Sequence, residues 1–489
     1  MRLRERTDPE ISKPQREEDI MSATGAVGTP AAPASHVIGR KLDSIPFSVY
    51  HVVLIVVLGF VGFIEGYDLA LSGSLLVLAK PPLHLTPDEV RWLAVGPTFV
   101  VVLGGFAAAA MSDRVSRLMV MQIGVILSTL CTLLILLAQN FEQLLILRLV
   151  TGIGLGFTIS APFPIAAELM PAQHRRTYGA IYEVMLATAF TLLPFVAFVL
   201  ADHPSGFRLV GLPGGVTLFI APVLVYFLIP ESPRWLLRRG RPEAAVDAVN
   251  LIIRRCGGRV APLAVAELGS GPATARDKLP PFIALFRPGQ LRWTAVGILC
   301  GLCGGTAYYL IAILLPKALV DQGAAVTLSF GLSSLVFAAS IPGKLFNGFI
   351  MEIIGRRWTI TGAFVLSIPG ILLMMLAHRT GAAATSVFSA GALITGFTVL
   401  SCFPAVRVYL SEQFPTALRG RGHFFGESFA RIFAGVLAPF LLAPYTGSPS
   451  IFFGTMVVVV AVGALIPVLY GRETLGQLET FTEAVPELA

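Results

Sequence analysis

The chain has 489 residues, of which 55% are hydrophobic and only 13% are charged. A soluble protein of this length folds into several domains, and such domains carry roughly 25% charged residues. The charge here is too sparse to cover those surfaces, and the high apolar content excludes a disordered or fibrous chain. The composition therefore predicts a protein that crosses a membrane many times.

The net charge of +7 could indicate a nucleic-acid partner. The basic residues, however, fall in short clusters between apolar runs, which is typical of the loops of membrane proteins. We therefore expect a lipid bilayer and no nucleic acid as a partner. Four of the five cysteines lie inside apolar stretches, so we expect small apolar fillers there, with no disulfide framework and no metal site.

The first 46 residues mix acids and bases and then become rich in Ala, Pro and Gly. They lack the apolar core of a secretory signal, and we expect a disordered cytoplasmic tail. Twelve apolar stretches follow, each long enough to cross the hydrocarbon core as a helix. They lie at 47–77, 90–111, 118–138, 143–167, 177–200, 209–229, 294–316, 327–351, 358–377, 385–411, 423–443 and 451–470.

These stretches divide the chain into two six-helix halves, 47–229 and 294–470, with a linker at 230–293 and a tail at 471–489. Alternate loops carry pairs of arginines, whereas the other loops have few cations. The positive-inside rule then predicts that the arginine-rich loops, the linker and both termini are cytoplasmic. The arginine pairs are Arg114 and Arg117, Arg175 and Arg176, Arg356 and Arg357, and Arg419 and Arg421.

The two halves share an internal repeat. A shift of 244 positions places Glu168 on Glu412, Arg175 on Arg419, and Glu183 on Glu427. Duplicated halves of this kind are typical of secondary transporters, whose substrate site lies at the repeat interface near the middle of the membrane.

Several loop motifs resemble the major facilitator superfamily. The loop after the eighth stretch reads Gly348-Phe-Ile-Met-Glu352-Ile-Ile-Gly355-Arg356-Arg357, which fits the family signature G-x-x-x-D-R/K-x-G-R-R/K. The first-half copy keeps Asp113, Arg114 and Arg117. The sixth stretch ends in PESPR, and the twelfth ends in ETLG, like the family's PETKG. The resemblance implies an all-α integral membrane fold with twelve helices in two pseudo-symmetric halves, and transport by alternating access rather than an enzyme activity.

Within this superfamily the chain resembles the branch of sugar porters, organic ion transporters and aromatic-acid/proton symporters. The first stretch contains Glu65-Gly-Tyr67-Asp68, which is similar to motifs of both sugar porters and aromatic-acid symporters. The sugar porters' seventh-span glutamine motif is absent. Arg407 takes the place of their sugar-stacking tryptophan, which favours an organic anion over a sugar.

Charged side chains at membrane depth are costly, so a functional role is the default interpretation. Glu65 and Asp68 are three residues apart and share a helix face. Two carboxylates so close in a low-dielectric medium disfavour double ionisation, which suits one of them to carry a proton. The resemblance implies that Asp68 and Arg148 form the coupling pair, with a structural salt bridge as the alternative.

Other candidates lie in the second half. Arg407 is midway along the tenth stretch and could hold a substrate carboxylate, or else a buried acid such as Glu427. Tyr308 and Tyr309 could stack on a substrate ring, or form an ordinary contact between helices.

Three further charges lie in the membrane. Glu183, Glu427 and Arg431 could bind ligand, form a gate or a second proton site, or pair only with one another. Lys344 is expected to extend to the nearby interface.

The loop charges match the family's cytoplasmic ion-pair network, which the resemblance implies closes the inner mouth of the transporter. A positive-inside signal alone would explain the arginines but not the acids among them. This predicted gate consists of Asp113, Arg117, Glu168, Arg175, Glu231, Glu352, Arg356, Glu412, Arg419 and Glu473.

The sequence thus predicts a monomeric, multi-pass transporter of the inner membrane that moves a small aromatic or other carboxylate together with a proton and needs no cofactor. A sugar or polyol symporter and an uncoupled facilitator or exporter are the alternatives within the same fold. A membrane enzyme is disfavoured because the histidines are scattered and almost all lie at span ends or in loops.

Overall fold

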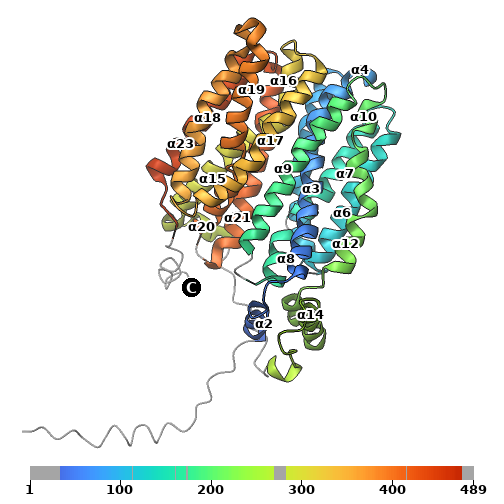
Figure 1. Ribbon diagram of the computed structural model, residues 1–489, viewed down its shortest axis with the longest axis vertical. Coiled ribbons are helices and arrows are strands. Elements are labelled where there is room, and N and C mark those ends of the chain that lie inside the picture. The colour runs from blue at the N-terminus through green and yellow to red at the C-terminus, as the bar shows by residue number, and fades with distance from the viewer. Residues whose placement is uncertain are drawn as a thin grey trace, which may run out of the picture.

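The computed structural model describes residues 34–112, 114–159, 161–171, 175–268, 282–414 and 416–475. In this part of the chain, twelve helices are long and apolar enough to span a membrane, and there is no strand. They form two bundles that lie side by side, the first blue to green and the second yellow to red (Figure 1). The predicted all-α fold with twelve spans in two halves is confirmed.

In the first half, the first, second, third and fifth spans are built on single long helices. Pro162 ends the fourth span's first helix, because proline lacks the N–H donor that a continuing helix needs. The sixth span consists of short helical pieces. The helices are α3 (Val49–Leu78), α5 (Pro87–Ser112), α6 (Arg117–Leu134), α7 (Phe141–Ile159), α8 (Pro162–Leu169), α9 (Arg175–Val199), α10 (Gly206–Leu209), α11 (Leu212–Val216) and α12 (Ala221–Leu228).

In the second half, the seventh, tenth and eleventh spans each join two α-helices through a π-helical segment. The helices are α15 (Pro288–Tyr309), α16 (Leu315–Asp321), α17 (Val326–Ile350), α18 (Arg356–Leu376), α19 (Ala384–Thr395), α20 (Phe403–Glu412), α21 (Thr416–Ala430), α22 (Ala438–Leu442) and α23 (Pro449–Tyr470). The π segments are Leu310–Leu314, Gly396–Leu400 and Arg431–Leu437. Such segments often occur at functional sites.

The seventh span is longer than predicted, since it runs from Pro288 to Asp321 rather than over 294–316. Its first two turns contain polar residues that hide them from a hydropathy pattern. Arg292, for example, donates a hydrogen bond to the carbonyl of Tyr470 at 3.2 Å. At the other end, an i,i+4 ion pair of Lys317 and Asp321 extends the helix beyond the apolar stretch.

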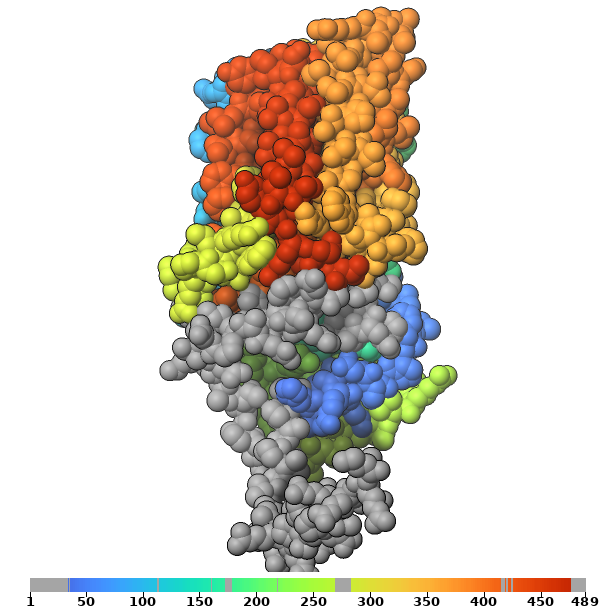
Figure 2. Space-filling view, turned by 90° about the vertical axis from the view of Figure 1, so that its left-hand side faces the viewer, coloured from blue at the N-terminus to red at the C-terminus, as the bar shows by residue number. Residues whose placement is uncertain are grey.

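The prediction of a disordered tail is wrong for residues 34–46. Residues Ala34–Asp43 form the amphipathic helix α2, whose Ile38 and Leu42 are buried together with Ile45. Their core also includes side chains of the linker helix α14 (Pro242–Arg255). Helices α2 and α14 lie beneath the bundles, and α2 also projects there in the space-filling view (Figures 1 and 2). We call this end of the molecule the linker side.

The two halves pack tightly at the end opposite the linker side. The ring centroids of Phe190 (α9) and Phe337 (α17) lie 4.9 Å apart, and the hydroxyl of Ser334 donates to the carbonyl of Thr191 at 2.9 Å. A Cβ on Gly73 (α3) would come within 2.5 Å of the carbonyl oxygen of Ala312 in the seventh span. Only a glycine permits this approach of the two backbones.

Glycines also bring the second and fourth spans together. A Cβ on Gly156 (α7) would lie 2.4 Å from the carbonyl oxygen of Val101 and 2.5 Å from the backbone nitrogen of Gly105, both on α5. The glycine run of the fourth span therefore serves helix packing, as small residues do inside membranes.

We expect Gly156→Val to separate these helices and to lower the stability of the protein in detergent by about 1–3 kcal/mol, the usual cost of overpacking. Gly454→Val on α23 is the matched control, because nothing lies within 4 Å of a Cβ there. Thermal unfolding followed by tryptophan fluorescence would check this. Equal melting temperatures for the two variants would contradict the packing argument.

Candidate functional site

A cavity of about 680 Å³ lies between the two halves, within the size range of small-molecule sites. At its inner end it is lined by Glu65, Tyr182, Arg407, Glu427 and Arg431. It also reaches Arg117, Ser411 and His423, which lie close to the linker-side ends of their spans. The cavity therefore opens towards the linker side and is closed at the opposite end by the packed halves.

Six charged side chains meet where the halves face one another near this inner end. We call them the interface cluster: Glu65 and Glu183 from the first half, and Lys344, Arg407, Glu427 and Arg431 from the second half. The first half thus contributes two acids, whereas the second half contributes three cations and one acid. The opposite charges hold the halves together.

Glu183 is the most strongly held acid of the cluster. One carboxylate oxygen lies 2.5 Å from Nζ of Lys344 and the other lies 2.5 Å from Nη1 of Arg407. Only 3% of Glu183 and 3% of Lys344 are exposed. The expectation that Lys344 extends to the interface is therefore wrong, because it turns to a carboxylate across the gap between the halves.

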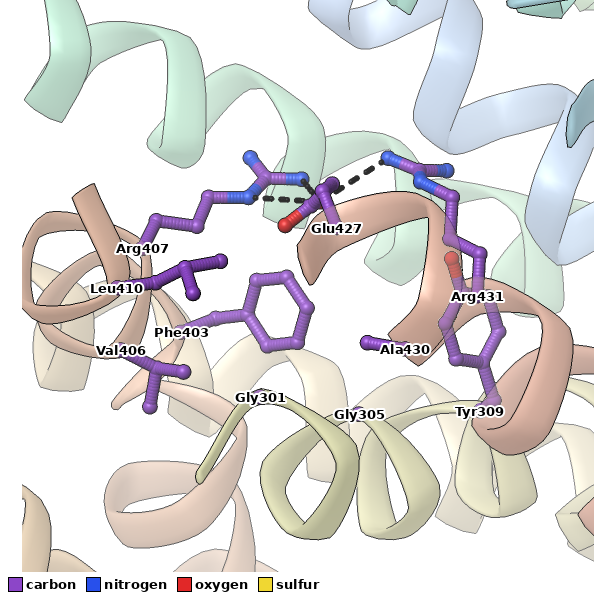
Figure 3. A pocket seen from close by; sticks show the side chains of 10 residues that line it. All are labelled: Gly301, Gly305, Tyr309, Phe403, Val406, Arg407, Leu410, Glu427, Ala430 and Arg431. Atoms are coloured by element: carbon purple, nitrogen blue, oxygen red, sulfur yellow. Dashed lines mark hydrogen bonds and ion pairs between the residues drawn. The ribbon is translucent and has the colours of Figure 1, made fainter. Parts of the chain in front are cut away.

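Glu427 lies between two guanidinium groups (Figure 3). Its Oε1 atom is 3.0 Å from Nη2 of Arg407 and 3.4 Å from Nη2 of Arg431. Two alternatives noted from the sequence are thus both present in the structure. Glu427 pairs with Arg431, and Arg407 pairs with the buried acid Glu427. Arg407 also lies over the ring of Phe403, 4.9 Å from its centroid.

Arg431 is the least satisfied cation of the cluster. Its Nη2 atom also lies 3.5 Å from Oε1 of Glu65, but Nε and Nη1 have no hydrogen-bond partner among the described residues. Only 6% of Arg431 is exposed, and it lines the cavity. Buried donors without a partner are costly, and such a group at a cavity is suited to bind an anion.

Glu65 and Asp68 share a helix face but have different partners, so the predicted carboxylate pair does not act as one unit. Glu65 accepts a hydrogen bond from the hydroxyl of Tyr182 and faces Arg431. Asp68 accepts one from Thr132 at 2.5 Å and faces Arg148. The first-span helix directs Glu65 to the interface and Asp68 into the first half.

Asp68 and Arg148 are brought together as the resemblance implied. An Nη1 atom of Arg148 lies 3.5 Å from the Asp68 carboxylate, and Nη2 donates to the Asp68 backbone carbonyl at 2.7 Å and to Ser72 at 2.8 Å. At most 2% of either charged residue is exposed. Neither lines the cavity described above, so this pair can affect substrate only through helix movement.

The two tyrosines differ in position. Tyr309 lines a small cavity beside Arg407 and Arg431 (Figure 3). Tyr308 packs against Phe190, Phe337 and Phe403, so it belongs to the aromatic contact that closes the end opposite the linker side. The interpretation of Tyr308 as a packing residue is therefore the better one.

The ion pairs described in the predicted loop network join residues of the same half. Arg117 lies 2.6 Å from Glu168. In the second half, Arg356 pairs with Glu352 at 3.0 Å and with Glu412 at 3.2 Å. Asp113 lies outside the described residues, as do the side chains of Arg175 and Arg419.

The remaining loop acids accept hydrogen bonds from backbone N–H groups. Glu473 accepts them from Arg356 at 2.9 Å and from Arg357 at 3.1 Å, at the start of α18. Glu231 accepts one from Ser232 at 2.9 Å. A carboxylate at a helix N-terminus is favourable, so Glu473 anchors the chain after the twelfth span to α18.

Three side chains of the site were not predicted to lie there. Lys344 was seen but not placed in the cluster, and Tyr182 and Thr132 were not singled out although they hold Glu65 and Asp68. The sequence feature that could have indicated a buried role for Lys344 is its position inside a long apolar helix, six residues before the helix ends. Uncharged hydrogen-bonding residues in an apolar span give no comparable signal.

We expect Glu183→Gln to leave the buried Lys344 without a carboxylate and to destabilise the protein by about 3 kcal/mol or more. The double variant Lys344→Met with Glu183→Gln should recover much of this loss, because it removes the uncompensated charge. Reversible unfolding in mixed micelles measures both. A double variant no more stable than Glu183→Gln would rule out the buried pair.

Comparisons with known proteins identify the family and the fold. The chain is 25% identical over 443 residues to a niacin transporter of Acinetobacter baylyi, covering 89% of this chain and 97% of that protein. It is 25% identical over 423 residues to a gallate transporter of Pseudomonas putida, covering 84% and 90%. The fold matches a partially occluded inward-open structure of the xylose transporter XylE from Escherichia coli, with a TM-score of 0.70, 17% identity, and 88% of this chain and 99% of that chain covered. The model of the Major Facilitator Superfamily matches residues 58–423, and the chain belongs to that superfamily of membrane transporters.

Proposed function

We propose that the protein is a symporter that moves a small aromatic carboxylate together with a proton, by alternating access of the cavity between its halves. The observation that carries this proposal is Arg431, a buried cation that lines the cavity and has two nitrogen donors without a partner in the part of the chain that the structure describes. A guanidinium group suits a carboxylate because its donors match the two oxygens.

The wall of the cavity favours a flat apolar body on this carboxylate. Phe163 and Tyr182 line it on the first-half side, with their ring centroids 4.9 Å apart. Apart from the hydroxyl of Tyr182, the polar groups at its inner end are charged, whereas a sugar is held largely by neutral hydrogen-bonding groups. Niacin and gallate, which the two relatives named above are said to transport, are both carboxylates on an aromatic ring. These relatives therefore support an aromatic acid over a sugar or polyol.

The proton is assigned to Asp68 in this proposal. Protonation of Asp68 removes its charge and weakens its ion pair with Arg148, so the first and fourth spans are then free to shift relative to each other. Because both side chains are buried, the uncompensated charge that remains is costly unless the helices rearrange. This linkage couples proton binding to a change of helix packing.

We further propose that the linker side faces the cytoplasm. The arginine pairs of the short loops and the linker lie at this end, and the positive-inside rule places such loops in the cytoplasm. The cavity would then be open to the cytoplasm in this structure, as expected for the release step of an importer. A bacterial inner membrane is the proposed location.

Proton coupling is tested in proteoliposomes with an imposed pH gradient and a panel of benzoate, nicotinate, gallate, hexoses and polyols. We expect uphill accumulation of at least one aromatic acid. Asp68→Asn should abolish uphill accumulation but keep exchange of substrate across the membrane. Asp88→Asn is the control, because Asp88 is exposed and pairs only locally with Arg91.

Accumulation of a hexose and of no acid would overturn the substrate assignment. Equal uptake with and without the gradient would instead support the alternative of an uncoupled facilitator. Unchanged uphill transport by Asp68→Asn would remove Asp68 from the coupling role.

The anchor is tested by Arg431→Gln. Loss of a charged hydrogen-bond donor costs about 1.5–3 kcal/mol, so we expect the acid to bind roughly 10- to 100-fold more weakly. Arg379→Gln, at an exposed position outside the cavity, should bind as the wild type does. Isothermal titration calorimetry on the purified protein measures both. An unchanged affinity in Arg431→Gln would place the carboxylate elsewhere.

A further inference from the structure

The interface cluster has no net charge when all its members are ionised. Three carboxylates, of Glu65, Glu183 and Glu427, face the three cations Lys344, Arg407 and Arg431. A singly charged anion that binds Arg431 would leave one uncompensated negative charge in a buried site, which is strongly unfavourable. One proton taken up by one of the three carboxylates restores the balance.

The distances indicate which carboxylate loses the least Coulomb energy when it is protonated. Glu183 has two cations at 2.5 Å, and Glu427 has Arg407 at 3.0 Å with a second guanidinium at 3.4 Å. Among the described residues, Glu65 forms an ion pair with Arg431 alone, at 3.5 Å. Because this is the longest ion pair of the cluster, Glu65 loses the least Coulomb energy when it takes a proton.

The other partner of Glu65 suits both of its protonation states. The hydroxyl of Tyr182 donates to the carboxylate, and after rotation it can accept a hydrogen bond from a protonated carboxyl group. Glu65 also lines the cavity, so a proton can reach it from solvent. The titratable and charged groups that face or interact with Glu65 are Tyr178 and Tyr182 on α9, Tyr308 and Tyr309 on α15, Arg407 on α20 and Arg431 in the eleventh span.

The substrate and Glu65 use the same guanidinium group. An incoming carboxylate that binds Nε and Nη1 of Arg431, which have no partner among the described residues, competes with the weak contact to Glu65, and a proton on Glu65 removes that competitor. Proton and anion therefore favour each other's binding, as thermodynamic linkage requires.

We infer that each substrate anion binds Arg431 together with one proton on Glu65, at a proton site separate from Asp68. The inference rests on the proposed function and specifies its substrate class: the site takes a singly charged anion, because a dianion would require a second proton on a more strongly held carboxylate. Substrate loading is then electroneutral, and the proton of Asp68 drives the later change of packing.

The test measures binding and proton uptake on the purified full chain. Benzoate is the probe, since its carboxyl group is ionised from about pH 6 to about pH 8. Calorimetric titrations in two buffers of different ionisation enthalpy count the protons taken up. We expect one proton per benzoate, with an affinity that falls about tenfold per unit of rising pH wherever one proton is taken up.

Variants identify the residue that takes up this proton. Glu65→Gln should bind benzoate with a pH-independent affinity and no proton uptake. Tyr182→Phe removes the hydroxyl that stabilises the ionised carboxylate and leaves Glu65 in place, so binding should persist to higher pH. Asp68→Asn should still take up one proton on binding. Asp88→Asn is the control for an unchanged titration.

Each outcome decides the question. Three results would overturn the Glu65 assignment: benzoate binding without proton uptake, a wild-type pH slope in Glu65→Gln, or loss of proton uptake in Asp68→Asn. All three would leave the proposed anion transport in place. If Glu65→Gln does not fold, the pH dependence of benzoate affinity in Tyr182→Phe tests the assignment instead. A pH dependence that is not shifted from the wild type contradicts the inference. Failure of benzoate and of every other acid of the panel to bind would overturn the proposed function itself.

Discussion

The ion pairs of Glu183 with Lys344 and Arg407 are the interaction on which the rest of the structure depends, because they join the two halves at the inner end of the cavity. All three side chains come from membrane spans, where a single charge is costly. If the halves separated at this level, each half would be left with buried charges that have no partner. The pairs therefore fix how the halves meet, and that arrangement fixes the floor of the cavity and the donors of Arg431.

The halves are joined by two kinds of contact. At the end opposite the linker side, aromatic rings and glycine backbones pack closely, as in Phe190 against Phe337 and Gly73 against the seventh span. Near the inner end of the cavity, the contacts are charged. Apolar contacts inside a bilayer can be exchanged for lipid or for other apolar contacts at little cost, but buried charges cannot separate without compensation. Separating the halves at this level thus requires other groups to replace the lost partners of the charges.

The sequence was sufficient for the fold because each span is long, apolar and bounded by polar loops. It also indicated the Asp68–Arg148 pair, through the resemblance to known transporters. It could not show that Glu65 and Asp68 point to different partners, since helical spacing gives a shared face but not the rotation of each side chain. It could not place Lys344 either, because its partner is 161 positions away in the sequence. Helix α2 was missed because its apolar face is only a few residues long and is covered by the linker.

We conclude that the buried charges of Glu183 and Lys344 fix how the two halves meet. The most direct measurement is the distance between spin labels at Met119 (α6) and Ile353 (after α17), which are exposed near the linker side of the two halves. In the double variant Lys344→Met with Glu183→Gln, we expect a second population at a different distance, because the charged contact that fixes the halves is lost. A distance distribution identical to that of the wild type would contradict the claim.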